Sequence, residues 1–162
     1  MIDWYLKVVR DNYANFSGRA RRSEYWYYTL CGIIINIVLS VIDSLIGLDF
    51  DIVGTIYSLA VFIPGLAVLV RRMHDIGKSG WYVLILFLPF IIAAVWFGVL
   101  AIDTSGSGFT TWAIVPALLL IGGLIWMLVL LCTEGDSGPN EYGEDPKRPY
   151  NEIDEIGTPE TY

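Results

Sequence analysis

The chain has 162 residues, of which 55 % are hydrophobic and 17 % charged, and its mean hydropathy is +0.56. Soluble domains carry about 25 % charged residues, so this composition excludes an ordinary soluble domain and indicates a membrane protein. The net charge of −7 arises at the C-terminal end, where residues 133–162 hold nine acidic residues against two basic ones. The rest of the chain is balanced in charge and lacks the basic face that nucleic-acid binding needs, so no nucleic-acid partner is expected.

The first element expected is a short amphipathic helix over residues 2–16. Apolar side chains recur there at three- and four-residue steps, with basic side chains between them. Such a helix either lies on the membrane surface or packs against the end of a helical bundle, and the two arrangements are compatible.

Four apolar stretches follow, each long enough to cross a hydrocarbon core about 30 Å thick as a helix. Because backbone groups find no water in that core, each stretch must be helical. The expected spans cover about 25–46, 52–70, 81–102 and 112–132. The fold predicted is therefore an all-α, polytopic membrane domain over 1–147, followed by a flexible acidic tail over 148–162 that is too polar to fold alone.

Polar and helix-breaking residues inside the spans are few. Asn36 is expected to form a hydrogen bond between helices. Pro64, Pro89 and Pro116 each remove a backbone hydrogen bond and kink a span, either to shape the bundle or to provide a gating hinge. The pair Gly122–Gly123 allows two helices to approach closely.

The basic residues predict the direction of the spans. All ten flank one side of a four-span arrangement, because they precede the first span, separate the second from the third, or follow the fourth. Cytoplasmic flanks carry an excess of Lys and Arg, so both termini are expected in the cytoplasm. The segment Val70–Trp81 is then a short cytoplasmic connection, in which Arg71 and Asp75 are spaced to pair.

Motifs for a metal or a cofactor are absent from the sequence. Gly77–Ser79 reads GKS, but a phosphate-binding loop needs glycine where Arg72 stands, so no nucleotide site is expected. His74 is the single histidine, so a histidine-rich metal site cannot form within one protomer. We therefore expect no cofactor and no metal. His74 and Asp75 remain the one candidate acid–base pair for catalysis.

The first and third spans begin at the basic side, where their N-termini present free N–H groups and a partial positive charge. Such termini bind anions, and lipid phosphate is the anion at hand on a membrane surface. The hypothesis is a patch for anionic headgroups made of Arg19, Arg21, Arg22, Arg71, Arg72, Lys78 and Ser79. The alternative is that these cations pair with Glu24, Asp75 and the acidic tail and serve only the topology.

Three stretches of the chain read FSGRARRSEYW, IYSLAVFIPGLAVLVRRMHDIGKSGW and CTEGDSGPNEYGEDPK. In order and spacing they resemble signature stretches of the bacterial inner-membrane family called domain of unknown function 805. The resemblance covers about residues 12–147 and implies a multi-span protein of the bacterial inner membrane without an established activity. All three stretches fall on the expected cytoplasmic side, where we expect a structural cluster of Glu24, Trp26, His74, Asp75, Trp81, Asn140 and Tyr142.

The function these features favour is a non-enzymatic membrane protein whose cytoplasmic cluster binds anionic lipid headgroups or a protein partner. The expected partners are membrane lipids, with a homo-oligomer or another membrane protein as a further possibility. One alternative is a small oligomeric transporter or channel, although transport pathways usually place charged residues inside the spans. Another alternative is a membrane enzyme that uses His74 and Asp75.

Overall fold

The computed structural model describes residues 1–47, 52–102 and 113–147, so the tail expected over 148–162 lies outside the described residues. The helices are α1 (Ile2–Leu6), the π-helix η1 (Lys7–Asp11), α2 (Arg22–Ile46), α3 (Ile52–Asp75), α4 (Tyr82–Ile102) and α6 (Ile114–Cys132). Within the described ranges the four long helices, α2, α3, α4 and α6, are long and apolar enough to cross a membrane. The all-α fold with four candidate spans is thereby confirmed.

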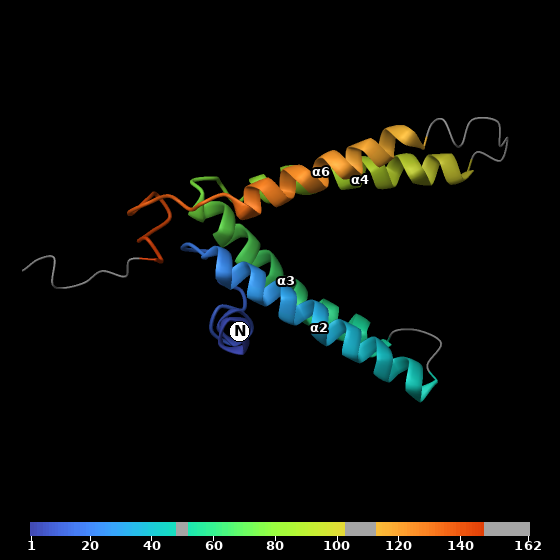
Figure 1. The fold of residues 1–162 in the computed structure, drawn as a ribbon, viewed down its shortest axis with the longest axis horizontal. Coiled ribbons are helices and arrows are strands. Elements are labelled where there is room, and N and C mark those ends of the chain that lie inside the picture. The colour runs from blue at the N-terminus through green and yellow to red at the C-terminus, as the bar shows by residue number, and fades with distance from the viewer. Residues whose placement is uncertain (48–51, 103–112, 148–162) are drawn as a thin grey trace, which may run out of the picture.

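The long helices form two antiparallel hairpins, α2 with α3 and α4 with α6, which converge at one end and diverge toward the other (Figure 1). The buried core lies where they converge and includes Tyr28 of α2, Met73 of α3, Leu86 of α4 and Leu131 of α6. Along the diverging arms large apolar side chains stay exposed. Such surfaces suit a bilayer, because lipid tails are as apolar as the side chains they meet.

The N-terminal segment packs on the α2–α3 hairpin and also keeps an exposed apolar side. The Tyr5 ring stacks on Tyr28 with 5.8 Å between ring centres, and Val8 is fully buried. The expected packing against the bundle is therefore confirmed, whereas Ile2 and Leu6 stay exposed and the expected position on the membrane surface remains a prediction. Its helical part ends at Asp11 rather than at residue 16, because Asn12 leaves the helical conformation and its side-chain amide donates to the Lys7 carbonyl.

Helix α3 extends one turn further than its hydropathy predicts. The continuous apolar stretch ends at Val70, yet the helix continues to Asp75 and closes at Gly77, whose φ is +65°. The N–H of Lys78 donates to the Met73 carbonyl at 2.9 Å, which completes a Schellman-type C-cap. The first half of the expected connection Val70–Trp81 is therefore helical. Its charged side chains can lie there because buried polar partners take the place of water as their hydrogen-bond partners.

Two polar contacts hold the α2–α3 hairpin within the apolar region. Ser58 Oγ donates to Asn36 Oδ1 at 3.0 Å, which confirms the hydrogen bond between helices expected for Asn36. Near the far end, Asp43 Oδ2 accepts the N–H groups of Val53 at 3.0 Å and Gly54 at 3.3 Å. Asp43 of α2 therefore caps the N-terminus of α3 from the neighbouring helix.

The α4–α6 hairpin depends on one glycine of the Gly122–Gly123 pair. A Cβ at Gly123 would lie 2.8 Å from the Cβ of Pro89, whereas a Cβ at Gly122 would meet nothing within 4 Å. We expect Gly123→Ala to lower the free energy of unfolding by about 1–3 kcal/mol, because the Pro89 ring cannot swing away as a flexible side chain could. Gly122→Ala, its matched control, should leave stability unchanged or slightly raised. Thermal unfolding in detergent, followed by circular dichroism, checks the pair, and equal melting temperatures would contradict this packing.

Candidate functional site

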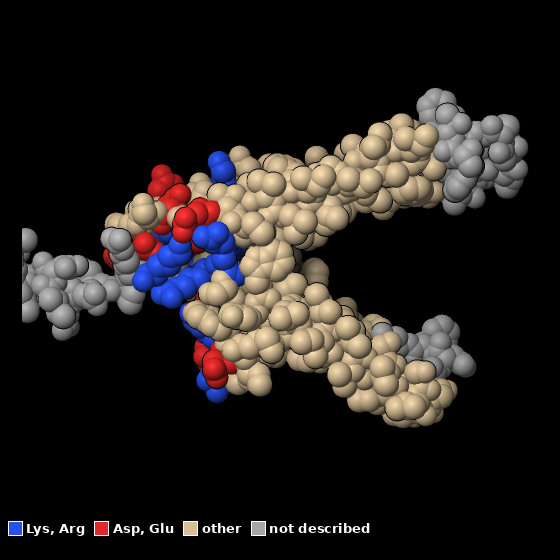
Figure 2. Space-filling view, viewed as in Figure 1, with Lys and Arg blue, Asp and Glu red and all other residues tan. Residues whose placement is uncertain are grey.

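Charged side chains gather where the two hairpins converge (Figure 2). We call this region the charged end and define it as residues 7–24, 71–82 and 132–147. It holds every Lys and Arg that the structure describes. The three stretches that carry the family resemblance therefore meet in space.

Asp75 is the centre of a buried ion cluster. Its Oδ1 accepts from Arg19 Nε at 3.1 Å, and its Oδ2 accepts from Arg72 Nη1 at 2.5 Å. The side chains of Asp75, Arg19 and Arg72 are 5 %, 1 % and 0 % exposed. Arg72 also donates to the Leu131 and Thr133 carbonyls at the end of α6. The pairing of Arg71 with Asp75 expected from their spacing is wrong, because Arg72 faces α6 and Asp75 while Arg71 faces α2.

The segment after α6 lies across this cluster, and we call residues 133–147 the strap. Arg19 donates through Nη2 to the Asp136 carbonyl at 2.5 Å and through Nη1 to the Gly138 carbonyl at 2.6 Å. In the backbone, the Asp136 N–H donates to the Asp75 carbonyl at 2.8 Å. The strap therefore ties the end of the α4–α6 hairpin to α3 and to the loop before α2.

His74 of α3 also connects this helix to the loop before α2 and to the strap, through a different set of contacts. Its Nδ1 lies 3.1 Å from the Gly18 carbonyl oxygen, and its ring stacks on Tyr142 with 4.0 Å between ring centres. The Asn140 amide donates to the His74 carbonyl at 2.9 Å. The side chains of His74 and Asp75 thus take separate partners.

Glu24 forms a second buried cluster at the start of α2. Its Oε1 accepts from Arg71 Nη1 at 2.7 Å and its Oε2 from Lys7 Nζ at 3.1 Å, and the Glu24 side chain is 1 % exposed. The Ala20 N–H donates to the Arg71 carbonyl at 3.0 Å, which holds α3 beside the first turn of α2. The Nε and Nη2 atoms of Arg71 are buried without a hydrogen-bond partner among the described residues.

The outer cations differ in their partners. Arg22 donates to the Cys132 carbonyl and pairs with Glu134, which also accepts from Lys147. Lys147 and then Arg22 hold the pKa of the Glu134 carboxyl below its usual range. Lys78 lies over the Tyr82 ring, 5.4 Å from its centre.

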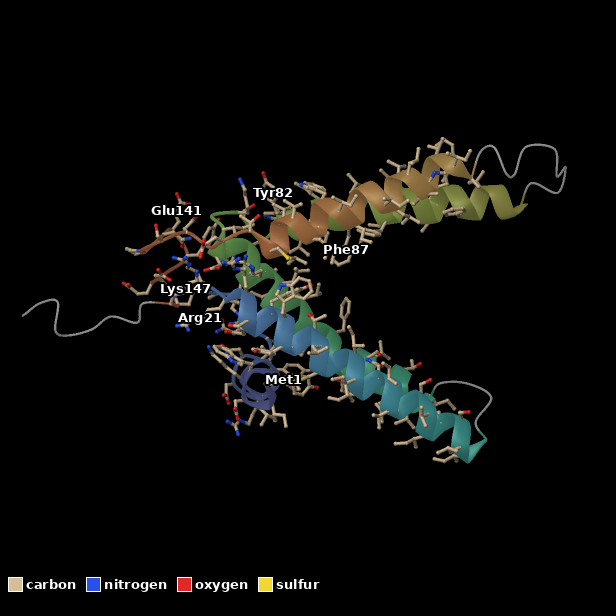
Figure 3. The ribbon with its side chains drawn as sticks, in the orientation of Figure 1. Met1, Arg21, Tyr82, Phe87, Glu141 and Lys147 are labelled. Atoms are coloured by element: carbon tan, nitrogen blue, oxygen red, sulfur yellow. The ribbon has the colours of Figure 1, made fainter. Side chains whose placement is uncertain are left out.

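The remaining outer groups are separated. Arg21 has no ion pair within the described ranges, and Ser79 carries no charge. Arg21 and Tyr82 lie on opposite sides of the charged end (Figure 3). Lys78, beside Tyr82, and Arg21 therefore do not share one patch.

Most of the residues expected to cluster are together, and two are not. Glu24, His74, Asp75, Asn140 and Tyr142 all contact another of the family-like segments. Two tryptophans expected in the cluster lie outside it: Trp26 is 36 % exposed and Trp81 is 75 % exposed. Sequence reasoning missed Lys7 and Gly135, for which no residue pattern gave a signal.

Cavities beside the charged end are apolar or small. A groove of about 510 Å³ between the hairpins is lined by apolar side chains, including Phe16, Leu66 and Trp81. A cavity of about 210 Å³ lies within the strap beside Glu134, Asp145 and Lys147. Among the described residues, no group of three or more His, Cys, Asp or Glu side chains is arranged to hold a metal ion.

Comparison with known proteins identifies the family of the chain. Residues 13–144 match the family described as Protein of unknown function (DUF805). The chain is 38 % identical over 146 residues to Inner membrane protein YhaI of Escherichia coli (strain K12), an alignment that covers 90 % of this chain and 97 % of that protein. It is 36 % identical over 150 residues to Inner membrane protein YhaH of the same strain, with 90 % and 98 % covered. No solved structure matches the chain.

Proposed function

Since the chain belongs to the DUF805 family, whose Escherichia coli relatives are inner membrane proteins, we propose that its charged end faces the cytoplasm and binds anionic lipid headgroups without catalysing a reaction. The chain is a multi-pass inner-membrane protein with four apolar helices. The proposal adds the orientation of its ends and the ligand of its charged end.

The observation that carries this proposal is the one-sided placement of the cations. In the described part of the chain every Lys and Arg lies at the charged end (Figure 2), and large apolar side chains are exposed along the diverging arms. Two of these cations are paired with aromatic rings, Lys7 over Trp4 at 5.0 Å and Lys78 over Tyr82 at 5.4 Å. Aromatic residues favour the headgroup level, and each Lys or Arg near an anionic leaflet contributes about 1 kcal/mol of attraction.

Two members of the hypothesised patch are already occupied by buried partners. Arg19 and Arg72 are buried and occupied by Asp75 and by carbonyls of the strap and of α6, so they hold the fold together. The outer residues Arg21, Lys78 and Ser79 remain for contact with headgroups. Lys78 would serve lipids beside α4, and Arg21 would serve lipids beside α2.

The orientation can be tested by labelling. Lys78→Cys, in a chain with Cys31 and Cys132 replaced by Ala, should react with a membrane-impermeant maleimide only after the inner membrane is permeabilised. Gly47→Cys, at the exposed residue that follows the opposite end of α2, is the matched control and should react from outside. Labelling of Lys78→Cys in cells with an intact inner membrane would contradict the proposed orientation.

Lipid preference can be tested on the purified full chain in detergent. Native mass spectrometry with equal phosphatidylglycerol and phosphatidylcholine should show several-fold tighter binding of phosphatidylglycerol, as expected for cations near the surface. The preference should fall as ionic strength rises, because salt screens exposed charges. Equal binding of the two lipids at low salt would overturn the proposed function.

A further inference from the structure

Three arginines are buried at the charged end, and two of them have every side-chain nitrogen engaged. Arg19 uses Nε, Nη1 and Nη2 for Asp75 and the Gly138 and Asp136 carbonyls. Arg72 uses its three nitrogens for Asp75 and the Leu131 and Thr133 carbonyls. Full engagement is what burial demands, since an unpaired buried donor on a charged group is costly.

Arg71 is the exception. Its side chain is 4 % exposed, yet only Nη1 is engaged, by Glu24 at 2.7 Å. Nε and Nη2 are buried and have no partner among the described residues. These two nitrogens form one edge of the guanidinium, and their N–H bonds run parallel. That edge matches the two oxygens of a carboxylate or a phosphate.

The surroundings of Arg71 favour an anion. The carbonyl of Arg71 accepts a hydrogen bond from the Ala20 N–H, so the backbone of Arg71 lies beside the start of α2, a helix of 25 residues. Arg21 is the N-cap residue there, and no side chain caps that terminus. Lys7 and Arg71 share one acidic group, Glu24, and Arg21 beside them has no ion pair among the described residues. The helix N-terminus adds a partial positive charge.

We propose that the Nε–Nη2 edge of Arg71 binds a phosphate group, from an anionic phospholipid headgroup or from free phosphate. This site deepens the proposed function and rests on it. The edge is closed to solvent in this structure, so a side chain beside Arg71 must move for the phosphate to enter.

Two variants of the full chain in detergent test the site from opposite directions. Arg71→Lys keeps the charge but removes the two-donor edge, and should weaken phosphatidylglycerol binding in native mass spectrometry about tenfold. Glu24→Gln removes the competing carboxylate and should tighten binding several-fold. Arg10→Lys, on an exposed cation paired with Asp11, is the matched control and should stay within about twofold.

Inorganic phosphate separates the two sources of the ligand. If millimolar phosphate raises the melting temperature of the wild-type chain but not of Arg71→Lys, the site takes free phosphate. If phosphate has no effect and phosphatidylglycerol binds with the expected pattern, the site takes the headgroup. Either result supports the assignment to Arg71.

Failure of this site and failure of the proposed function give different results. Unchanged phosphatidylglycerol binding in both Arg71→Lys and Glu24→Gln would overturn the site while leaving headgroup binding intact. No preference of the wild-type chain for phosphatidylglycerol, together with no effect of phosphate, would overturn both. If Arg71→Lys fails to fold, Glu24→Gln decides alone, because a merely structural Arg71 would not bind phosphate more tightly when its partner loses charge.

Discussion

Asp75→Asn should lower the free energy of unfolding by about 3–5 kcal/mol, the range found when one partner of a buried ion pair is removed. Asp75 is the one carboxylate that contacts both Arg19 and Arg72 within the described residues. Asparagine keeps the shape of the side chain but leaves two buried guanidinium groups without a counter-charge. Because both arginines also hold carbonyls of the strap and of α6, their displacement should loosen the junction between the hairpins.

The control for Asp75→Asn is Asp11→Asn, which breaks the exposed pair with Arg10 and should barely change stability. Thermal unfolding of both variants in the same detergent gives the comparison. Hydrogen exchange at the Asp136 amide, which is bonded to the Asp75 carbonyl, reports release of the strap separately. Similar melting temperatures for the two variants would show that the buried cluster does not hold the hairpins together.

Gly135→Ala should be nearly as damaging, with a loss of about 3 kcal/mol or more. A Cβ at Gly135 would overlap Asp75 Oδ2 and lie 2.6 Å from Asp75 Cγ. A carboxylate on a free side chain could move aside, but Arg19 and Arg72 hold this one from both oxygens. The strap must therefore lift away from α3, or the ion cluster must break.

Ser137→Ala, an exposed change in the same strap, is the matched control for Gly135→Ala and should be close to neutral. Combining Gly135→Ala with Asp75→Asn should cost less than the sum of the two single changes, because both act on the same contact. Additive losses in thermal unfolding would mean that the two residues stabilise different parts of the molecule.

Side-chain direction at the charged end could not be predicted from the sequence. Arg71 and Arg72 are adjacent, equally basic and both buried, yet one faces Glu24 and the other faces Asp75. Successive residues on a helix point about 100° apart, so their partners depend on which helices lie on each side. For the same reason the family-like stretches indicated which residues cluster but could not predict that Trp26 and Trp81 are exposed.

The lengths of the helices likewise depend in part on the local sequence and in part on tertiary contacts. The hydropathy pattern located all four spans, because a chain in hydrocarbon must satisfy its backbone within each segment. It stopped α3 at Val70, since Arg71 to Asp75 read as a polar connection. Those charges continue the helix because Glu24, Arg19 and the α6 carbonyls compensate them, and each of these partners comes from a distant part of the chain.

The amino-acid sequence by itself determined that this protein is a four-span membrane protein with its cations at one end, because hydropathy and the placement of charge are local properties of each segment. Only the tertiary structure decided which cations are buried counter-ions and which are open to a ligand. That distinction depends on contacts between residues that are 47 to 59 positions apart in the chain: Arg71 with Glu24, Arg19 with Asp75, and Arg72 with Leu131. It also depends on the packing of the strap, which brings these residues together.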